Sequence, residues 1–158
     1  MDWRRLGDTT LDEWTAFLTM KESPLVTVAE DTYTAARPHT RLALGMMGIE
    51  SRWFTAFNRN VKANNNPFNL KYPDRDAFMT FSSPAEGVKA WKERITSPTY
   101  KDGIYAGTQT LEELIHVFAP EYDDNREDEY VAFVLVIAEG LAKTMTLNMT
   151  KGLIPLPA

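Results

Sequence analysis

The stretch that decides the fold reads Leu42-Ala43-Leu44-Gly45-Met46-Met47-Gly48-Ile49-Glu50-Ser51-Arg52-Trp53-Phe54. Its large apolar residues recur at helical spacing and predict a helix with one apolar stripe, made of Leu42, Met46, Ile49 and Trp53. Glu50 lies beside this stripe and is the only carboxylate between Asp31 and Asp74. A carboxyl group against apolar walls loses water, which raises its pKa. Glu50 is therefore our candidate for a general acid that stays protonated near neutral pH. The alternative is an ordinary helix-end glutamate, exposed to solvent or paired with Arg52 or Arg59.

An asparagine-rich segment follows, Asn64-Asn65-Asn66-Pro67-Phe68-Asn69-Leu70-Lys71-Tyr72. Asparagine tolerates turn geometries, so this segment could be a solvated loop and nothing more. The functional interpretation is that asparagine amides brace the loop against the Glu50 helix and orient sugar groups. Helix and loop together point to cleavage of a sugar chain.

The bulk composition is that of a soluble globular protein: 158 residues, 44% hydrophobic and 25% charged. A net charge of −5 argues against a nucleic-acid binder held by phosphate contacts, and it also means that any binding to an anionic cell wall must be local. There is no cysteine, no apolar run of membrane-spanning length and no signal-peptide pattern. We expect synthesis in the cytoplasm, no membrane insertion, and a single domain over 1–150 followed by a tail or linker over 151–158, with further domains if the chain is part of a longer protein.

Capping patterns predict a mainly α fold. Helix starts are indicated by Thr10-Leu11-Asp12-Glu13, Ser23-Pro24, Ser83-Pro84-Ala85-Glu86 and Thr110-Leu111-Glu112-Glu113. The second of these helices is expected to run to Arg37, and a last helix is expected near 126–145. Residues 68–72 and 77–81 read as two short strands around the turn 73–76. The expected architecture is a helical bundle around the Glu50 helix, with one short β-hairpin at the edge of a cleft.

The order of these pieces resembles the glucosaminidase-type peptidoglycan hydrolases of the lysozyme superfamily. The resemblance rests on the helix with Gly-Ile-Glu-Ser-Arg-Trp at 48–53, and then on Asn-Asn-Pro-Phe-Asn-Leu-Lys-Tyr at 65–72. Later segments follow in the family's order, at 78–87, at 97–102, and from Phe118-Ala119-Pro120 through Asn125 to Tyr130. The resemblance spans roughly residues 40–140. It implies an α+β lysozyme-like fold with Glu50 at the cleft floor as the general acid on the glycosidic oxygen.

The chain departs from the family pattern at several points. Phe118 stands where the family usually has a tyrosine that lines the active site, and Tyr122 is our candidate to replace it. Asn69 replaces the usual glycine. The lobe that often supplies a second carboxylate is shortened to Pro73-Asp74-Arg75-Asp76. Candidates for that carboxylate are Asp74 and Asp76, with Asp123 and Asp124 behind them, although aspartate is also a common turn residue. A single acid suffices if the substrate's own N-acetyl group is the nucleophile.

The resemblance and the loop pattern give the expected substrate-binding residues: Asn65, Asn66, Phe68, Asn69, Tyr72 and Tyr100. Trp53 and Trp91 fit inner helix faces, so we expect them in the core. The two histidines, His39 and His116, are isolated, and we expect neither a metal nor a cofactor.

The predicted function is hydrolysis of peptidoglycan glycan strands, as an endo-β-N-acetylglucosaminidase or a muramidase. A phage endolysin or a virion-associated lysin fits the missing signal peptide, and the expected partner is the cell wall. A lytic transglycosylase is the nearest alternative, because it also uses one glutamate. A catalytically silent wall-binding or structural tail module is the alternative from another class.

Overall fold

The computed structural model describes residues 1–55, 62–119 and 126–150, with side chains described as far as Leu141. Within these ranges the chain is mainly helical, as expected. The elements in chain order are η1 (Trp3–Leu6), α1 (Leu11–Met20), η2 (Pro24–Val28), α2 (Ala29–Ala36), α3 (Thr40–Ser51), α5 (Pro84–Thr96), η3 (Tyr100–Gly103), α6 (Leu111–Phe118) and α7 (Glu127–Thr150), where η marks a 3₁₀ helix.

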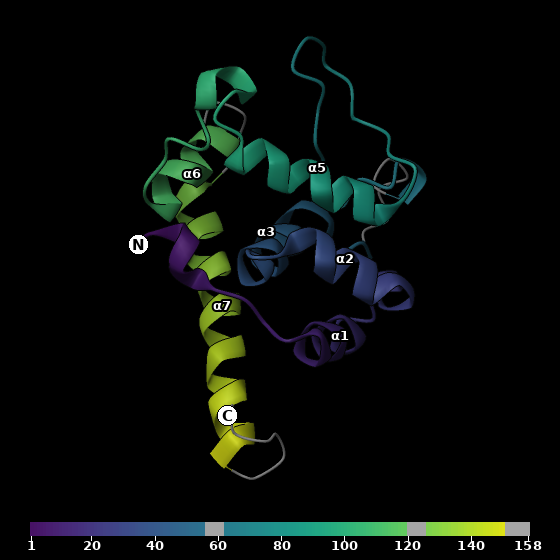
Figure 1. Ribbon diagram of the computed structural model, residues 1–158, viewed down its shortest axis with the longest axis vertical. Coiled ribbons are helices and arrows are strands. Elements are labelled where there is room, and N and C mark those ends of the chain that lie inside the picture. The colour runs from purple at the N-terminus through teal and green to yellow at the C-terminus, as the bar shows by residue number, and fades with distance from the viewer. Residues whose placement is uncertain (56–61, 120–125, 151–158) are drawn as a thin grey trace.

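The helices pack around α3, the helix that carries Glu50 (Figure 1). α7 runs along one side of the molecule, and its C-terminal part extends beyond the other helices. α5 lies across the opposite end, with α2 and then α1 beneath it in the view of Figure 1. The N-terminal segment returns to the start of α6, where the Leu111 amide donates to the Met1 carbonyl over 2.8 Å.

Three of the four predicted helix starts are confirmed as α-helix starts. The Thr10 and Thr110 hydroxyls each accept from the amide three residues on, and Glu13 and Glu113 return the bond, so both capping boxes are complete. The Ser83 hydroxyl accepts from the Glu86 amide at the start of α5. These local patterns fix the first residues of α1, α5 and α6.

The helix predicted from Pro24 to Arg37 is wrong as a single element. The structure has the short 3₁₀ helix η2 and then α2, because Val28 leaves the helical region with φ −130° and ψ 33°. The expected N-cap at Ser23 is present, since its hydroxyl accepts from the Leu25 amide over 3.2 Å.

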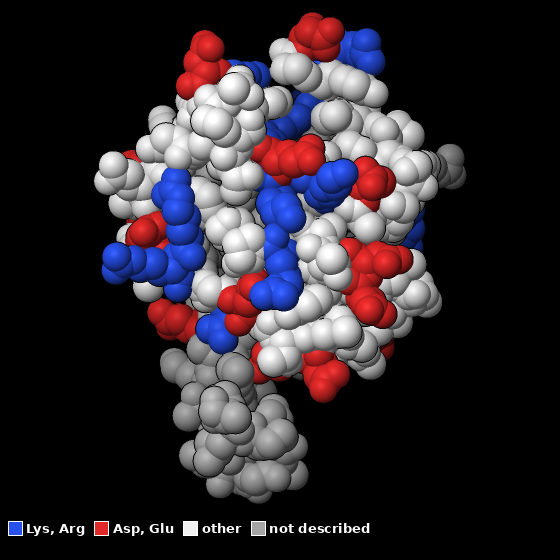
Figure 2. Space-filling model, viewed as in Figure 1, with Lys and Arg blue, Asp and Glu red and all other residues white. Residues whose placement is uncertain are grey.

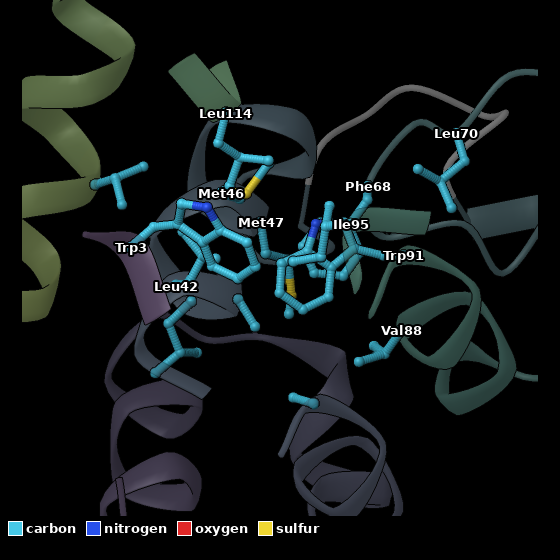
Figure 3. Packing of buried hydrophobic residues seen from close by; sticks show 14 of the residues in the cluster. Trp3, Leu42, Met46, Met47, Phe68, Leu70, Val88, Trp91, Ile95 and Leu114 are labelled. Carbon is cyan, nitrogen blue, oxygen red and sulfur yellow. The ribbon is translucent and has the colours of Figure 1, made fainter. Parts of the chain in front are cut away.

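The core is built from all parts of the described chain. Figure 3 shows Trp3 from the N-terminal segment and Leu114 from α6 on one side of Met46 and Met47 of α3. On the other side the Phe68 ring stacks on Trp91, with ring centroids 4.5 Å apart. Both of these rings are almost fully buried, and the predicted core role of Trp91 is confirmed.

Glycine allows α3 and α7 to pack closely. A Cβ atom at Gly45 would lie 2.9 Å from Cγ1 and 3.0 Å from Cα of Val134, which is on α7. A Cβ atom at Gly48 would lie 2.7 Å from the Phe133 ring, also on α7. The contacts at 2.9 Å and 2.7 Å are shorter than real Cβ atoms show, so glycine at these two positions lets the helices approach this closely. The approach brings the first turn of α7 to the last turn of α3.

The predicted β-hairpin of two strands is not confirmed. In the described part of the chain the segment 68–81 has one isolated antiparallel bridge, between Lys71 and Phe78. Two backbone hydrogen bonds flank it, from the Met79 amide to Leu70 and from the Tyr72 amide to Ala77. The segment turns back on itself as expected, but the pairing is too short for strands.

No helix in the described ranges is long and apolar enough to cross a membrane. The tail predicted for 151–158 lies outside the described residues.

Candidate active site

Glu50 lies in the last turn of α3. Residues 42–48 of this helix are all buried, whereas Glu50 is half-buried. The residue keeps part of its surface exposed, while its carboxyl group is enclosed closely enough for burial to shift its pKa. In the described part of the chain, no ion pair joins Glu50 to Arg52. The carboxyl group instead accepts a hydrogen bond from the Tyr130 hydroxyl. Arg59 lies outside the described residues.

Burial raises the pKa of Glu50 from its usual 4.5 to about 7. The hydrogen bond from Tyr130 opposes this rise, because it stabilises the charged form, and the Asn69 side chain also lowers the pKa. The balance leaves a carboxyl group that is half protonated near neutral pH, which is the range in which a general acid works best.

Tyr130 holds the carboxyl group from α7. Its hydroxyl donates to Oε1 of Glu50 over 2.8 Å, and its side chain is only 4% exposed. Burial and the neighbouring Glu50 raise the pKa of Tyr130 well above 10, so that it remains a donor. Tyr130 belongs to a segment that resembles the family, but nothing in its sequence context predicts a contact with Glu50. The close packing at Gly45 is not foreseeable from residue spacing.

Asn69 braces the other side of Glu50. Its side-chain amide donates to the main-chain carbonyl of Glu50, one of the carbonyls at the end of α3 that lack a partner within the helix. Asn69 has φ 50°, a left-handed conformation that asparagine adopts more readily than most residues. The expected brace between the asparagine-rich loop and the Glu50 helix is present at this residue.

Asn65 and Asn66 hold the loop itself. Asn66 is 1% exposed, and its amide donates to the carbonyls of Leu70 and Met79 over 2.9 and 3.0 Å. Asn65 donates to the Phe81 carbonyl over 3.0 Å. This burial does not fit the predicted contact of Asn66 with a glycan, because its side-chain polar atoms already form hydrogen bonds with the backbone.

The predicted aromatic contacts divide into two kinds. Phe68 is 1% exposed against Trp91, so its predicted contact with substrate is corrected to a core role. Tyr72 and Tyr100 are half-buried, each with an arginine over its ring: Arg75 at 4.0 Å and Arg94 at 5.0 Å. Tyr100 and Arg94 also line a pocket of about 320 Å³.

The predicted second carboxylates lie on the exposed turn of the segment 68–81. Asp74 and Asp76 are both exposed, and Asp76 pairs with Lys71 over 2.7 Å. That ion pair lowers the pKa of Asp76. Among the described residues, no carboxylate contributes to the shifted pKa of Glu50. Tyr122, Asp123 and Asp124 lie outside the described residues.

The chain leaves α3 through a left-handed turn. Arg52, Trp53 and Phe54 have φ of 47°, 53° and 66°. Such conformations cost roughly 1–2 kcal/mol for each residue that is not glycine. Strain of this kind is typical next to functional residues, because the surrounding structure must hold it in place. The Trp53 indole helps to hold this turn against α3, because its N–H donates to the Leu44 carbonyl over 2.9 Å.

No family model matches this chain, and no curated protein or solved structure matches it either. The chemistry must therefore be argued from the site itself. In the described ranges no group of three histidine, aspartate or glutamate side chains is arranged to hold a metal ion. What the described site offers is one carboxyl group with a pKa near neutrality, oriented by a buried hydroxyl and braced by an amide.

Proposed function

We propose that this protein cleaves the glycan strands of bacterial peptidoglycan, with Glu50 as the general acid. The observation that carries the proposal is the half-buried Glu50, whose pKa is about 7 and whose Oε1 accepts from Tyr130. The resemblance of the segments 48–53 and 65–72 to peptidoglycan hydrolases supplies the substrate class. A phage endolysin or a virion-associated lysin is the setting that we propose.

In the proposed reaction the protonated Glu50 donates its proton to the glycosidic oxygen as the C–O bond breaks. The bond's electrons leave with that oxygen, and positive charge develops on the sugar ring. Glu50 becomes a carboxylate at this moment. The Tyr130 hydroxyl stabilises that carboxylate, because a hydrogen bond to the charged form favours it.

Tyr130 also bears on the departure at Phe118. The family's tyrosine is missing there, and the Phe118 ring packs instead against Tyr105 with ring centroids 6.3 Å apart. Tyr130 supplies a hydroxyl to the acid from another position. This supports an active enzyme rather than a silent wall-binding module.

The described part of the site supplies one acid. Asp74 and Asp76 are exposed, and neither contributes to the environment of Glu50. We therefore favour a mechanism in which the substrate's own N-acetyl or hydroxyl group attacks the sugar carbon. Glu50 then takes a proton from the attacking hydroxyl, or from the water that opens the intermediate formed by the N-acetyl group. Attack by the N-acetyl group followed by water gives hydrolysis, and attack by a sugar hydroxyl gives the anhydro product of a lytic transglycosylase.

The test is digestion of purified peptidoglycan by the wild type and by Glu50→Gln, with products reduced by borohydride and identified by mass spectrometry. We expect the variant to lose at least about 100-fold in rate, the scale of general acid catalysis. The reduced end names the bond: N-acetylglucosamine for a glucosaminidase, N-acetylmuramic acid for a muramidase, and an unreduced anhydro end for a transglycosylase. Absence of cleavage of walls from several bacterial types, with the protein folded, would contradict the proposal.

A further inference from the structure

Basic side chains gather on one face of this acidic protein. Figure 2 shows Lys and Arg side chains near the middle of the face that is seen in Figure 1, with some Asp and Glu side chains beside them. Four basic residues come from η1, the end of α2 and α5: Lys92 donates to Arg37, Arg4 and Arg5 share Asp2, and the charges of Lys92 and Arg4 both act on His39. We call them the cationic cluster: Arg4, Arg5, Arg37 and Lys92.

The cluster is fixed by bonds that leave much of its charge uncompensated. The Lys92 ammonium donates to the main-chain carbonyl of Arg37 over 2.9 Å, and the Arg4 guanidinium donates to the carbonyls of Ala106 and Thr108. Carbonyl acceptors orient these cations but carry no net charge. Neutral carbonyls thus hold Lys92 and part of Arg4, and the cluster is open to solvent, with the Arg5 side chain 85% exposed and that of Arg37 59% exposed.

Two carboxylates form ion pairs with three of the four cations. Asp8 lies 3.1 Å from Arg37, and Asp2 lies 3.6 Å from Arg5 and 3.8 Å from Arg4. Four cations less two carboxylates leave the group with a charge of +2, in a chain whose net charge is −5. His39 lies within the group, but burial lowers its pKa, so it adds no charge near neutral pH.

The cationic cluster is at the opposite end of α3 from the candidate active site. Arg37 and His39 immediately precede α3, whereas Glu50 is in its last turn. Thr40 and Glu50 are ten positions apart along the helix, about 15 Å at the usual helical rise. A ligand on the cluster would therefore leave Glu50 accessible.

We propose that the cationic cluster binds anionic polymer of the bacterial cell wall and holds the enzyme on its substrate. This choice of partner rests on the proposed function. Wall polymers carry anions of two kinds, phosphodiester groups and peptide carboxylates, and arginine recognises either one through paired N–H donors. The protein as a whole is repelled by such a polymer, so attraction must come from a local surface of this kind.

The test measures co-sedimentation with insoluble Gram-positive walls, with every variant built on Glu50→Gln so that binding is not confused with cutting. Lys92→Glu and Arg5→Glu each reverse one charge of the cluster. Lys101→Glu is the matched control, because it changes the net charge equally from an exposed position in η3, beyond the end of α5. Arg5 is the second variant in case Lys92→Glu disturbs the packing of α5 on α2.

We expect each cluster variant to lose at least about threefold in wall affinity at low salt, and the difference to shrink as salt rises. Lys101→Glu should stay within about twofold of the parent, where only the net charge has changed. Walls stripped of phosphodiester polymer by hydrofluoric acid identify the anion. A cluster-dependent loss of binding on stripping assigns the phosphates, and retained cluster-dependent binding assigns the carboxylates.

The inference is overturned if the cluster variants bind walls as the parent does, or if Lys101→Glu loses as much as they do. It is also overturned if duplex DNA, rather than the wall, shows the cluster-dependent binding. Cleavage of soluble glycan fragments by wild-type protein separates this result from the proposed function. Cluster-dependent wall binding without cleavage would reject the hydrolase and keep the cluster, whereas cleavage without cluster dependence would do the reverse.

Discussion

The hydroxyl of Tyr130 lies 2.8 Å from Oε1 of Glu50, although 80 positions separate the two residues in the chain. The contact joins the first turn of α7 to the last turn of α3. It acts on the chemistry in two ways, because it orients the carboxyl group and because it keeps the pKa of Glu50 from rising further. Both effects can be measured separately.

Tyr130→Phe removes the hydrogen bond and keeps the ring. Loss of a bond that stabilises the carboxylate should raise the pKa of Glu50 above its value of about 7. Since the active form of a general acid is protonated, the falling limb of the pH–rate profile should move to higher pH. The maximal rate should fall roughly tenfold, the equivalent of one hydrogen bond to a charged group. Wall digestion followed across pH 5 to about 9 reads out both effects.

The matched control for this variant is Tyr33→Phe. The Tyr33 hydroxyl also donates a partly buried hydrogen bond, to the Thr9 carbonyl over 3.0 Å, but Tyr33 belongs to α2. We expect some loss of stability and an unchanged pH profile. A profile that moves equally in both variants would rule out a specific action of Tyr130 on Glu50.

Glu50→Gln should stabilise the protein in a pH-dependent way. The pKa of Glu50 is raised from 4.5 to about 7 on folding, so between these values the folded state binds more protons than the unfolded state. Wild-type stability is therefore lost as pH rises from 4.5 to 7. The gain from Gln should be near zero at pH 4.5 and approach about 3 kcal/mol above pH 7, from 1.36 kcal/mol for each pKa unit.

Urea denaturation of wild type and Glu50→Gln at both ends of this range provides the measurement. Gln keeps an oxygen that can accept from Tyr130, so the hydrogen bond itself is retained. A variant that is less stable than wild type at pH 8 would mean that the charged carboxylate contributes to folding, contrary to its burial-raised pKa.

Two features of Asn69 can be tested separately: its left-handed backbone conformation and the hydrogen bond of its side-chain amide. Asn69→Gly keeps the left-handed conformation at no steric cost, whereas Asn69→Ala adds a strain of about 1 kcal/mol at φ 50°. Both variants lose the amide that donates to Glu50. We expect Ala to be the less stable of the two, and both to lose activity to a similar extent. If Asn69→Gly retained full activity, the amide brace would have no part in catalysis.

Gly45 tests the close packing of α3 on α7. Gly45→Ala places a methyl group 2.9 Å from Cγ1 of Val134. Such overpacking costs about 1–3 kcal/mol, more than the gain of up to about 1 kcal/mol in helix propensity. We expect a lower melting temperature and reduced activity, because α7 carries Tyr130. Gly140→Ala on α7 is the control: among the described residues no atom is within 4 Å of its added Cβ, so it should be stabilising. Equal effects of the two substitutions would contradict the packing account.

The local parts of the fold were predictable, because their signals are local. The capping boxes at Thr10 and Thr110 each satisfy helix-end donors with side chains three residues apart, and both are present as predicted. The interruption at Val28 was not predictable from such signals. The absence of regular strands in 68–81 was not predictable from them either. There the side-chain amide of Asn66 donates to the backbone carbonyls of Leu70 and Met79.

The candidate site was predictable in part. Glu50 could be found because it is a lone carboxylate in an apolar helix. The stripe drawn through Ile49 and Trp53 was wrong, since Ile49 is 38% exposed and Trp53 lies in the left-handed turn after α3. α3 is surrounded on several sides, so its apolar spacing does not reveal which face is buried. The role of Tyr130 depends on long-range packing at Gly45 and leaves no local pattern.

The most direct test of the account is the pKa of Glu50 itself, measured by carbon-13 NMR titration of side-chain carboxyl groups in labelled protein. The signal that disappears in Glu50→Gln identifies the residue. The account predicts a midpoint of about 7. A midpoint near the usual 4.5 would show an ordinary solvated carboxylate, and would contradict the assignment of Glu50 as an acid that is protonated near neutral pH.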